Sequence, residues 1–174
     1  GTGAGAALSA GGFVPYFNYG GGLAVGGSVG PMTTSGTAQT FTYSLTGLDT
    51  ACSSGPGTAG NSCGIHIHTG MTCTGDAGGH YFTGSVGSDP WTSIAYTSDG
   101  AGKASASVSV TTGATSADVS GRALIVHGRD GGRIACGILG TGAGAALSAG
   151  GFVPYFNYGG GLAVGGSVGP MTTS

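Results

Sequence analysis

Charged side chains are scarce in this chain, and long apolar runs are missing. Only 6% of the residues are Asp, Glu, Lys or Arg, whereas about 25% is usual in globular proteins. With a net charge of −2, nothing favours nucleic acid or an anionic membrane as a partner. No apolar run approaches the ~20 residues of a membrane span. The chain begins with Gly1, not Met, and has no signal peptide, so we expect a mature chain or a piece of one.

Cysteine is also scarce, and the Cys-x-x-Cys motif is absent. The four cysteines are an even number, which without that motif favours disulfides and an oxidising, extracellular or secreted location. Residues 52–63 form a loop rich in Ser, Gly and Pro between two cysteines. A Cys52–Cys63 disulfide would close that loop.

Glycine, by contrast, is abundant, with 42 of 174 residues against an ordinary share of about 7%. Such a composition is compatible with disorder, but the middle of the chain alternates apolar and polar residues. Phe41, Tyr43 and Leu45 alternate with hydroxyl residues in the clearest strand. Further strands are predicted at residues 13–19, with Pro15 at a sheet edge, and at 23–29, 94–97, 104–110, 123–127 and 133–139. No stretch has helical periodicity, so we predict an all-β sandwich or barrel of about eight strands.

The two ends of the chain are identical. Residues 1–35 recur letter for letter at 140–174, an offset of 139 residues. We interpret this as a tandem array of 139-residue units, with a cloning duplication as the alternative. In this interpretation residues 1–12 are a Gly/Ala-rich linker, residues 13–139 are one unit, and residues 140–174 begin the next.

The repeated segment has no charge and is aromatic, which is unusual for a spacer. We expect neighbouring units of the same protein as its partners. One hypothesis is a continuous fibre, in which the strand at 152–158 adds to the open edge of the preceding unit. The other is beads on a string, separated by residues 140–151. Exposed aromatic residues favour the fibre.

The first candidate functional residues lie on one predicted strand, GIHIH at residues 64–68. Successive side chains of a strand point to opposite faces, so His66 and His68 share one face and the two isoleucines share the other. We expect the isoleucines in the core and both imidazoles outside, as a bidentate nitrogen site for copper or zinc. His80 and His127 are the other histidines of the chain.

All four histidines belong to motifs that occur in a fixed order. The motifs are GIHIH at 64–68, GHYF at 79–82, GRALIVH at 121–127 and GGRIACG at 131–137. Residues 39–139 thereby resemble the Cu/Zn superoxide dismutase family. The resemblance implies a Greek-key, immunoglobulin-like β-sandwich and an enzyme that disproportionates superoxide to oxygen and hydrogen peroxide.

The resemblance also implies a ligand set. His66, His68, His80 and His127 match the family's copper ligands, which gives one copper per repeat. His80 takes the place of the histidine that bridges copper and zinc, and is therefore a catalytic candidate as well as a metal ligand. Imidazole nitrogens suit copper.

Further residues match the family around this site. Cys73 and Cys136 take the places of its intrasubunit disulfide, which leaves Cys52 and Cys63 as a second pair. Arg133 takes the place of the arginine beside the copper and is the second catalytic candidate. A fixed guanidinium there attracts and orients a small anion such as superoxide.

The zinc site of the family is not matched. No histidine lies between His80 and His127, where the family's zinc ligands lie, and the segment from 127 to 133 is short. Both departures resemble copper-only superoxide dismutases, including tandem-repeat extracellular proteins, so we expect copper and no zinc. The alternative is a structural fibre or matrix subunit with a vestigial or auxiliary metal site.

Overall fold

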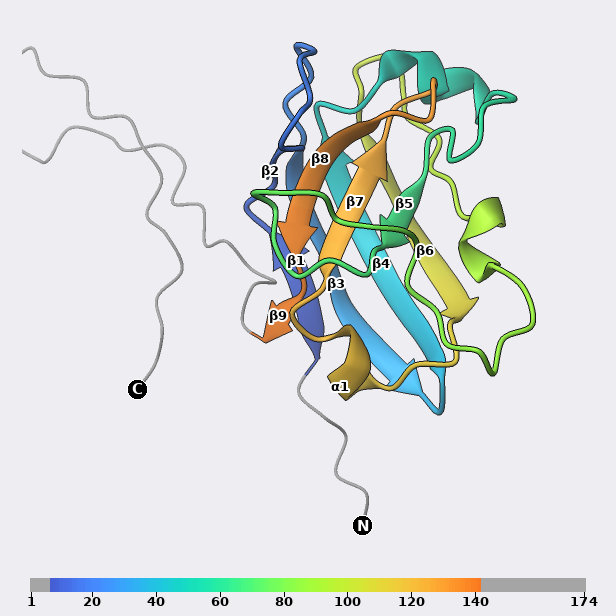
Figure 1. Ribbon diagram of the computed structural model, residues 1–174. Helices are drawn as coiled ribbons and strands as arrows, with labels where there is room; N and C mark the ends of the chain where they lie inside the picture. The colour runs from blue at the N-terminus through green and yellow to red at the C-terminus, as the bar shows by residue number, and fades with distance from the viewer. Residues whose placement is uncertain (1–6, 142–174) are drawn as a thin grey trace, which may run out of the picture.

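In a computed structural model, two antiparallel β-sheets face each other around a shared core (Figure 1). The structure describes residues 7–141. One sheet has the strand order β6-β4-β3-β1-β9 and the other the order β2-β8-β7-β5. The all-β prediction is confirmed, as an open sandwich and not a closed barrel.

Within residues 7–141 there are nine strands and three short helices. The strands are β1 (Leu8–Gly11), β2 (Val14–Pro15), β3 (Gly26–Ser35), β4 (Ala38–Thr46), β5 (Ile65–Ile67), β6 (Ala104–Thr111), β7 (Ala123–His127), β8 (Arg133–Ile138) and β9 (Gly140–Thr141). The helices are η1 (Thr50–Ser54), η2 (Pro90–Ser93) and α1 (Ser116–Val119). In this part of the chain no helix has the length and apolarity needed to cross a membrane.

The five-stranded sheet follows its sequence pattern closely. Phe41, Tyr43 and Leu45 of β4 are buried, and the hydroxyl residues between them are exposed. Phe41 lies opposite Val108 of β6. The four-stranded sheet completes the core with apolar residues of β5 and β7, such as Ile65. Each such side chain contributes about 1.5–3 kcal/mol to folding by its burial.

The predicted linker at residues 1–12 does not extend over residues 8–11, which form β1. Leu8 and Ala10 are buried there, and β1 pairs with β3 on one side and β9 on the other. The sequence of this strand has no alternation of apolar and polar residues, so no local pattern predicted it. The strand is held by its pairing with β3 and β9. β9 is Gly140–Thr141, the start of the second copy. The predicted strand at 152–158 lies outside the described residues.

Other predicted strands differ in extent. Of residues 13–19 only Val14–Pro15 is a strand, and it lies at a sheet edge as Pro15 indicated. The strand expected at 23–29 runs instead from Gly26 to Ser35. Residues 94–97 are not a strand: Ala95 makes one isolated bridge, and the buried side chain of Tyr96 anchors the segment through its hydroxyl.

Candidate metal centre

The histidines gather on the outer face of the four-stranded sheet. His66 of β5 lies opposite Ile125 of β7, and His127 ends β7. His68 follows β5 directly and forms an isolated bridge with His80. Since residues two apart in a strand share a face, His66 and His68 project to the same side as predicted.

The imidazoles lie on the outer face of the sheet, as predicted, but they are not exposed to solvent. His66, His68 and His127 are 1%, 1% and 0% exposed. The segment between β5 and η2 crosses in front of β7 and β8 (green in Figure 1) and carries His80. Trp91 of η2 is fully buried beside His66, with 5.9 Å between ring centroids. Alternation therefore identified the shared face but not the segment that covers it.

One nitrogen of each imidazole is fixed by an oxygen that can only accept a hydrogen bond. Three donate to backbone carbonyls and one to a carboxylate: His66 Nε2 to Ile94 (2.8 Å), His68 Nδ1 to Gly78 (2.9 Å), His127 Nδ1 to Gly131 (2.9 Å) and His80 Nδ1 to Asp89 Oδ2 (2.7 Å). These contacts assign the proton to the bonded nitrogen. In the neutral form of each ring, the other nitrogen carries the lone pair.

The unprotonated nitrogens converge. One ligand nitrogen from each of the four histidines lies within 4.8 Å of the other three. His68 Nε2 and His127 Nε2 are 3.4 Å apart, and with both protons on Nδ1 these are two facing lone pairs. His66 Nδ1 and His80 Nε2 are buried without a hydrogen-bond partner in the described residues. Buried polar atoms normally have partners, and a metal ion is the partner that four converging lone pairs fit.

Burial keeps the imidazoles of His66, His68 and His127 neutral. Desolvation is the main cause that lowers the pKa of His66 to about 2, of His68 to about 3 and of His127 to about 4. Neighbouring imidazoles lower the pKa of each further, whereas the hydrogen bond to a carbonyl raises it. At neutral pH all three lone pairs are therefore available to a metal.

Two glycines allow the backbone to approach the rings. Gly78, whose carbonyl fixes His68, has φ +68°, and a Cβ there would lie 2.1 Å from Thr69 Oγ1. At Gly64 a Cβ would lie 2.3 Å from His66 Cε1. A larger residue at Gly64 would displace the His66 ring, whereas one at Gly78 would be strained and would clash with Thr69.

Asp89 lies outside the four sequence motifs, but it holds His80. While Oδ2 accepts from His80, Oδ1 accepts from the backbone N–H of Trp91 at 2.9 Å and caps η2. The Trp91 indole donates to the carbonyl of Tyr81 at 2.8 Å. One carboxylate thus orients a candidate ligand and the helix that covers the site. Asp before Pro at a helix start was the sequence signal.

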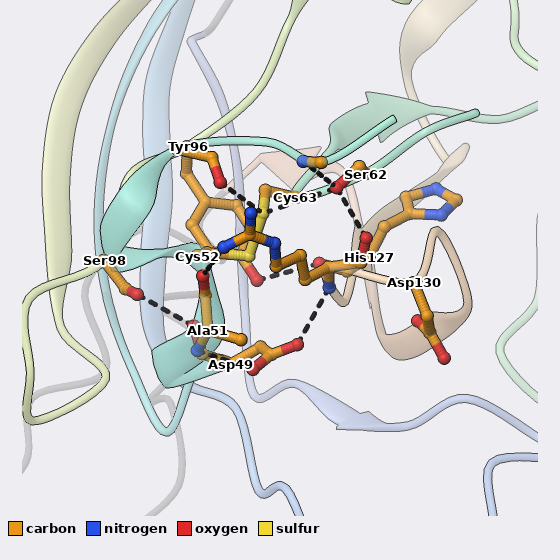
Figure 2. Close-up of a disulfide and its surroundings, with 12 residues drawn as sticks. Asp49, Ala51, Cys52, Ser62, Cys63, Tyr96, Ser98, His127 and Asp130 are labelled. Carbon is orange, nitrogen blue, oxygen red and sulfur yellow. Dashed lines mark hydrogen bonds between the residues drawn. A yellow bond between two sulfur atoms is a disulfide. The ribbon is translucent and has the colours of Figure 1, made fainter. Parts of the chain in front are cut away.

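The cysteines pair as the resemblance implied, in the disulfides Cys52–Cys63 and Cys73–Cys136. Cys63 immediately precedes Gly64 and the strand of His66. Figure 2 shows His127 close to the Cys52–Cys63 bond, and the Tyr96 hydroxyl donates to the His127 carbonyl at 2.8 Å. Cys136 of β8 ties the covering segment to the sheet beneath it.

Arg133 lies at the rim of the site. It shares with His68 and His80 the lining of a hollow of about 460 Å³. Its Nη2 donates to the Gly78 carbonyl, which also accepts from His68. Its Nη1 contacts Tyr16 and Asp76. The structure brings together all four predicted ligands and Arg133, whereas no sequence signal pointed to Tyr16 or Asp76.

Fold and site together define an all-β sandwich with a buried four-histidine group that could hold a metal ion. No protein-family model and no curated protein matches the chain. The two disulfides suit an oxidising environment.

Proposed function

We propose that this chain is a secreted, copper-only superoxide dismutase-like protein. The observation that carries the proposal is the convergence of four imidazole nitrogens, one from each histidine, within 4.8 Å. The four ordered motifs that resemble the Cu/Zn superoxide dismutase family support the choice of reaction. Arg133, at the rim of the hollow that His68 and His80 line, supports an anionic substrate.

The arrangement of the rings favours copper. The centroids of His66 and His68 are 6.4 Å apart and those of His80 and His127 6.5 Å, whereas the four other pairs are 4.4–5.5 Å apart. All six distances would be equal in a regular tetrahedron, so the rings form a tetrahedron that is flattened toward a square without being planar. A tetragonal set of nitrogen ligands suits Cu(II), while zinc prefers a tetrahedron.

The environment of His80 argues against a second metal. By resemblance to the Cu/Zn superoxide dismutase family, this histidine takes the place of one that bridges copper and zinc. Here Asp89 accepts from its Nδ1, so that nitrogen is already bonded. Among the described residues, the four histidines are the one group of three or more His, Cys, Asp or Glu side chains that could hold a metal ion.

The residues of the chain have separate tasks in this proposal. Bound copper would supply one-electron redox chemistry, through which two superoxide ions and two protons give oxygen and hydrogen peroxide. Arg133 attracts and orients the anion at the rim. Asp89 keeps the His80 proton on Nδ1, which leaves Nε2 for the metal. Trp91 excludes water from the side of His66.

Metal loading followed by a cytochrome c assay tests the proposal. We expect one copper per 139-residue unit and its loss in the double variant His66→Ala, His68→Ala. Arg133→Ala should retain copper and slow dismutation by about tenfold. Lys103→Ala, which removes the same charge from an exposed turn, is the matched control. Stoichiometric zinc without copper in native material would contradict the proposal.

A structural array is the second candidate, and β9 favours it. Gly140 and Thr141 begin the second copy of the repeat, yet they pair with Ser9 and Leu8 of the first. We propose that the start of each repeat completes the sheet of the unit before it, so that units join into a fibre with an auxiliary metal site. Electron microscopy of native material should show a regular repeat; separate particles would contradict it.

A further inference from the structure

A hydrogen-bond network extends from Arg133 away from the histidines. Its centre is the hydroxyl of Tyr16, a residue only 4% exposed. This hydroxyl accepts from Arg133 Nη1 and from the backbone N–H of Ala77 at 3.0 Å, and it donates to Asp76 Oδ1 at 3.0 Å. A tyrosine hydroxyl has one proton and two lone pairs, so its bonding capacity is fully used.

Asp76 adds a negative charge to the network. Its Oδ1 lies 2.7 Å from Arg133 Nη1 and also accepts from the backbone N–H of Gly78 at 3.0 Å. The Gly78 bond first, and then the bonds from Arg133 and Tyr16, lower the pKa of Asp76. The carboxylate is therefore ionised at neutral pH and offsets part of the charge on Arg133.

Arg133 borders two hollows, and the network holds it between them. One hollow lies over the histidines. The other, of about 490 Å³, is lined by Tyr16, Phe17 and Tyr19 among others. With the bonds to Tyr16, Asp76 and Gly78 in place, Nε–H and one Nη2–H of Arg133 have no partner among residues 7–141. These two donors remain for an anion.

We infer that Tyr16 and Asp76 are positioning residues: Tyr16 fixes the guanidinium of Arg133 at the metal centre, and Asp76 limits its attraction for anions. The inference rests on the proposed function in taking an anion as the ligand of this site. Without the Tyr16 hydroxyl, the guanidinium loses one of its three partners and can shift toward the second hollow. Without the Asp76 charge, it attracts anions more strongly.

The two residues should therefore have opposite effects on anion binding. Tyr16→Phe should weaken it by roughly two- to fivefold, because a mobile guanidinium loses more entropy on binding. Asp76→Asn keeps the acceptor oxygen and removes the charge. It should strengthen binding by roughly two- to fivefold and steepen the decline of affinity with salt.

Two probes measure this on the full chain. Azide is titrated into the Cu(II)-loaded protein by visible absorption, and phosphate into the metal-free protein by the NMR shift of Arg133 Nε–H. Tyr19→Phe is the matched control for the hydroxyl, since Tyr19 contacts the Leu23 N–H and not Arg133. Asp99→Asn is the control for charge, since Asp99 accepts from the turn residues Ala101 and Lys103. Both controls should bind like the wild type.

The order of affinities decides the inference. An anion affinity above wild type in Asp76→Asn, together with one below wild type in Tyr16→Phe, supports the two roles. Equal affinities, or a fall in both variants, would overturn them, because a merely structural network does not produce opposite effects. If Tyr16→Phe fails to fold, Asp76→Asn alone still decides. If the copper-loaded wild type shows no dismutation activity while the anion affinities keep this order, the proposed function is refuted and the inference is not.

Discussion

The two sheets of the sandwich differ sharply in chemistry. The five strands of one sheet contain no charged residue and no histidine, and the outer face of β4 and β6 presents exposed serine and threonine, such as Thr42 and Ser107. The strands of the other sheet carry His66, His127 and Arg133. The outer face of that sheet is covered, and its imidazoles are buried.

The difference shows that the same strand alternation serves two purposes. In both sheets the inward residues are mostly apolar and form one core. What differs is the chain that follows: β3 and β4 are joined by a tight turn, whereas β5 leads into the long segment that carries His80 and Asp89. Covering the outer face desolvates the imidazoles, and that desolvation keeps them unprotonated.

The largest effect that tests this contrast between the sheets is expected from low pH, which should lower the free energy of unfolding. The pKa values of His66, His68 and His127 are about 2, 3 and 4 in the fold, against 6.5 when unfolded. Below pH 6.5 the unfolded chain therefore binds more protons, and the free energy of unfolding falls as the pH falls. For metal-free protein we expect a loss of about 6 kcal/mol between pH 7.5 and 5.

Urea unfolding at several pH values measures this loss. The metal-loaded protein is the comparison: metal bound to the folded imidazoles should raise the free energy of unfolding throughout this range, while the loss with falling pH remains, because the unfolded chain still takes up the protons. A flat profile for the metal-free protein would mean that the imidazoles are solvated, and that the two outer faces do not differ as described.

The disulfides, which both lie on the side of the four-stranded sheet, should have the next largest effect. The Cys73–Cys136 bond spans 63 residues and the Cys52–Cys63 bond 11. Loop-closure entropy predicts about 4 kcal/mol for the first and about 3 kcal/mol for the second. Paired Cys→Ser variants compared by thermal unfolding test the order. A greater loss from the Cys52–Cys63 pair would show that its support of His127 outweighs chain entropy.

Much of the fold could be predicted from local pattern. Alternation identified β4 and β6, a continuous apolar run identified β7, and Pro15 indicated an edge strand. β1 could not be found this way, because Leu8–Gly11 has no alternation and its neighbours β3 and β9 are distant in sequence. The expected strand at 94–97 failed for a similar reason: Tyr96 is held by the carbonyl of His127, a contact that no local pattern encodes.

The grouping of the four histidines was predictable because histidine is rare in this chain and all four belong to the ordered motifs. The burial of the rings was not, since it depends on where the segment after His68 returns. Tyr16 and Asp76 gave no signal for the same reason. Their bonds to Arg133 join residues 117 and 57 positions apart in sequence.

A smaller effect is expected for the carboxylate that orients His80. Asp89→Asn removes the charge and leaves one acceptor oxygen in place of two, so the side chain can accept from His80 Nδ1 or from the Trp91 N–H that caps η2, but not from both. Metal affinity should fall by about tenfold, the lower end of the usual effect of such partners. Competition with a chelator of known affinity measures it, with Asp99→Asn as control. An unchanged affinity would mean that the backbone alone positions His80.

The smallest effect is expected on the outer face of the five-stranded sheet. Ser107 of β6 lies opposite Thr42 of β4, and both are exposed. Ser107→Thr would create a Thr–Thr pair across the two strands, and threonine suits a strand better than serine does. We expect a gain of about 0.3 kcal/mol in the free energy of unfolding and no change in metal content. Urea unfolding and metal analysis of the same sample measure both. A loss above about 1 kcal/mol would exceed what an exposed substitution produces, and would mean that another part of the protein packs on this face, as the segment around His80 does on the opposite sheet.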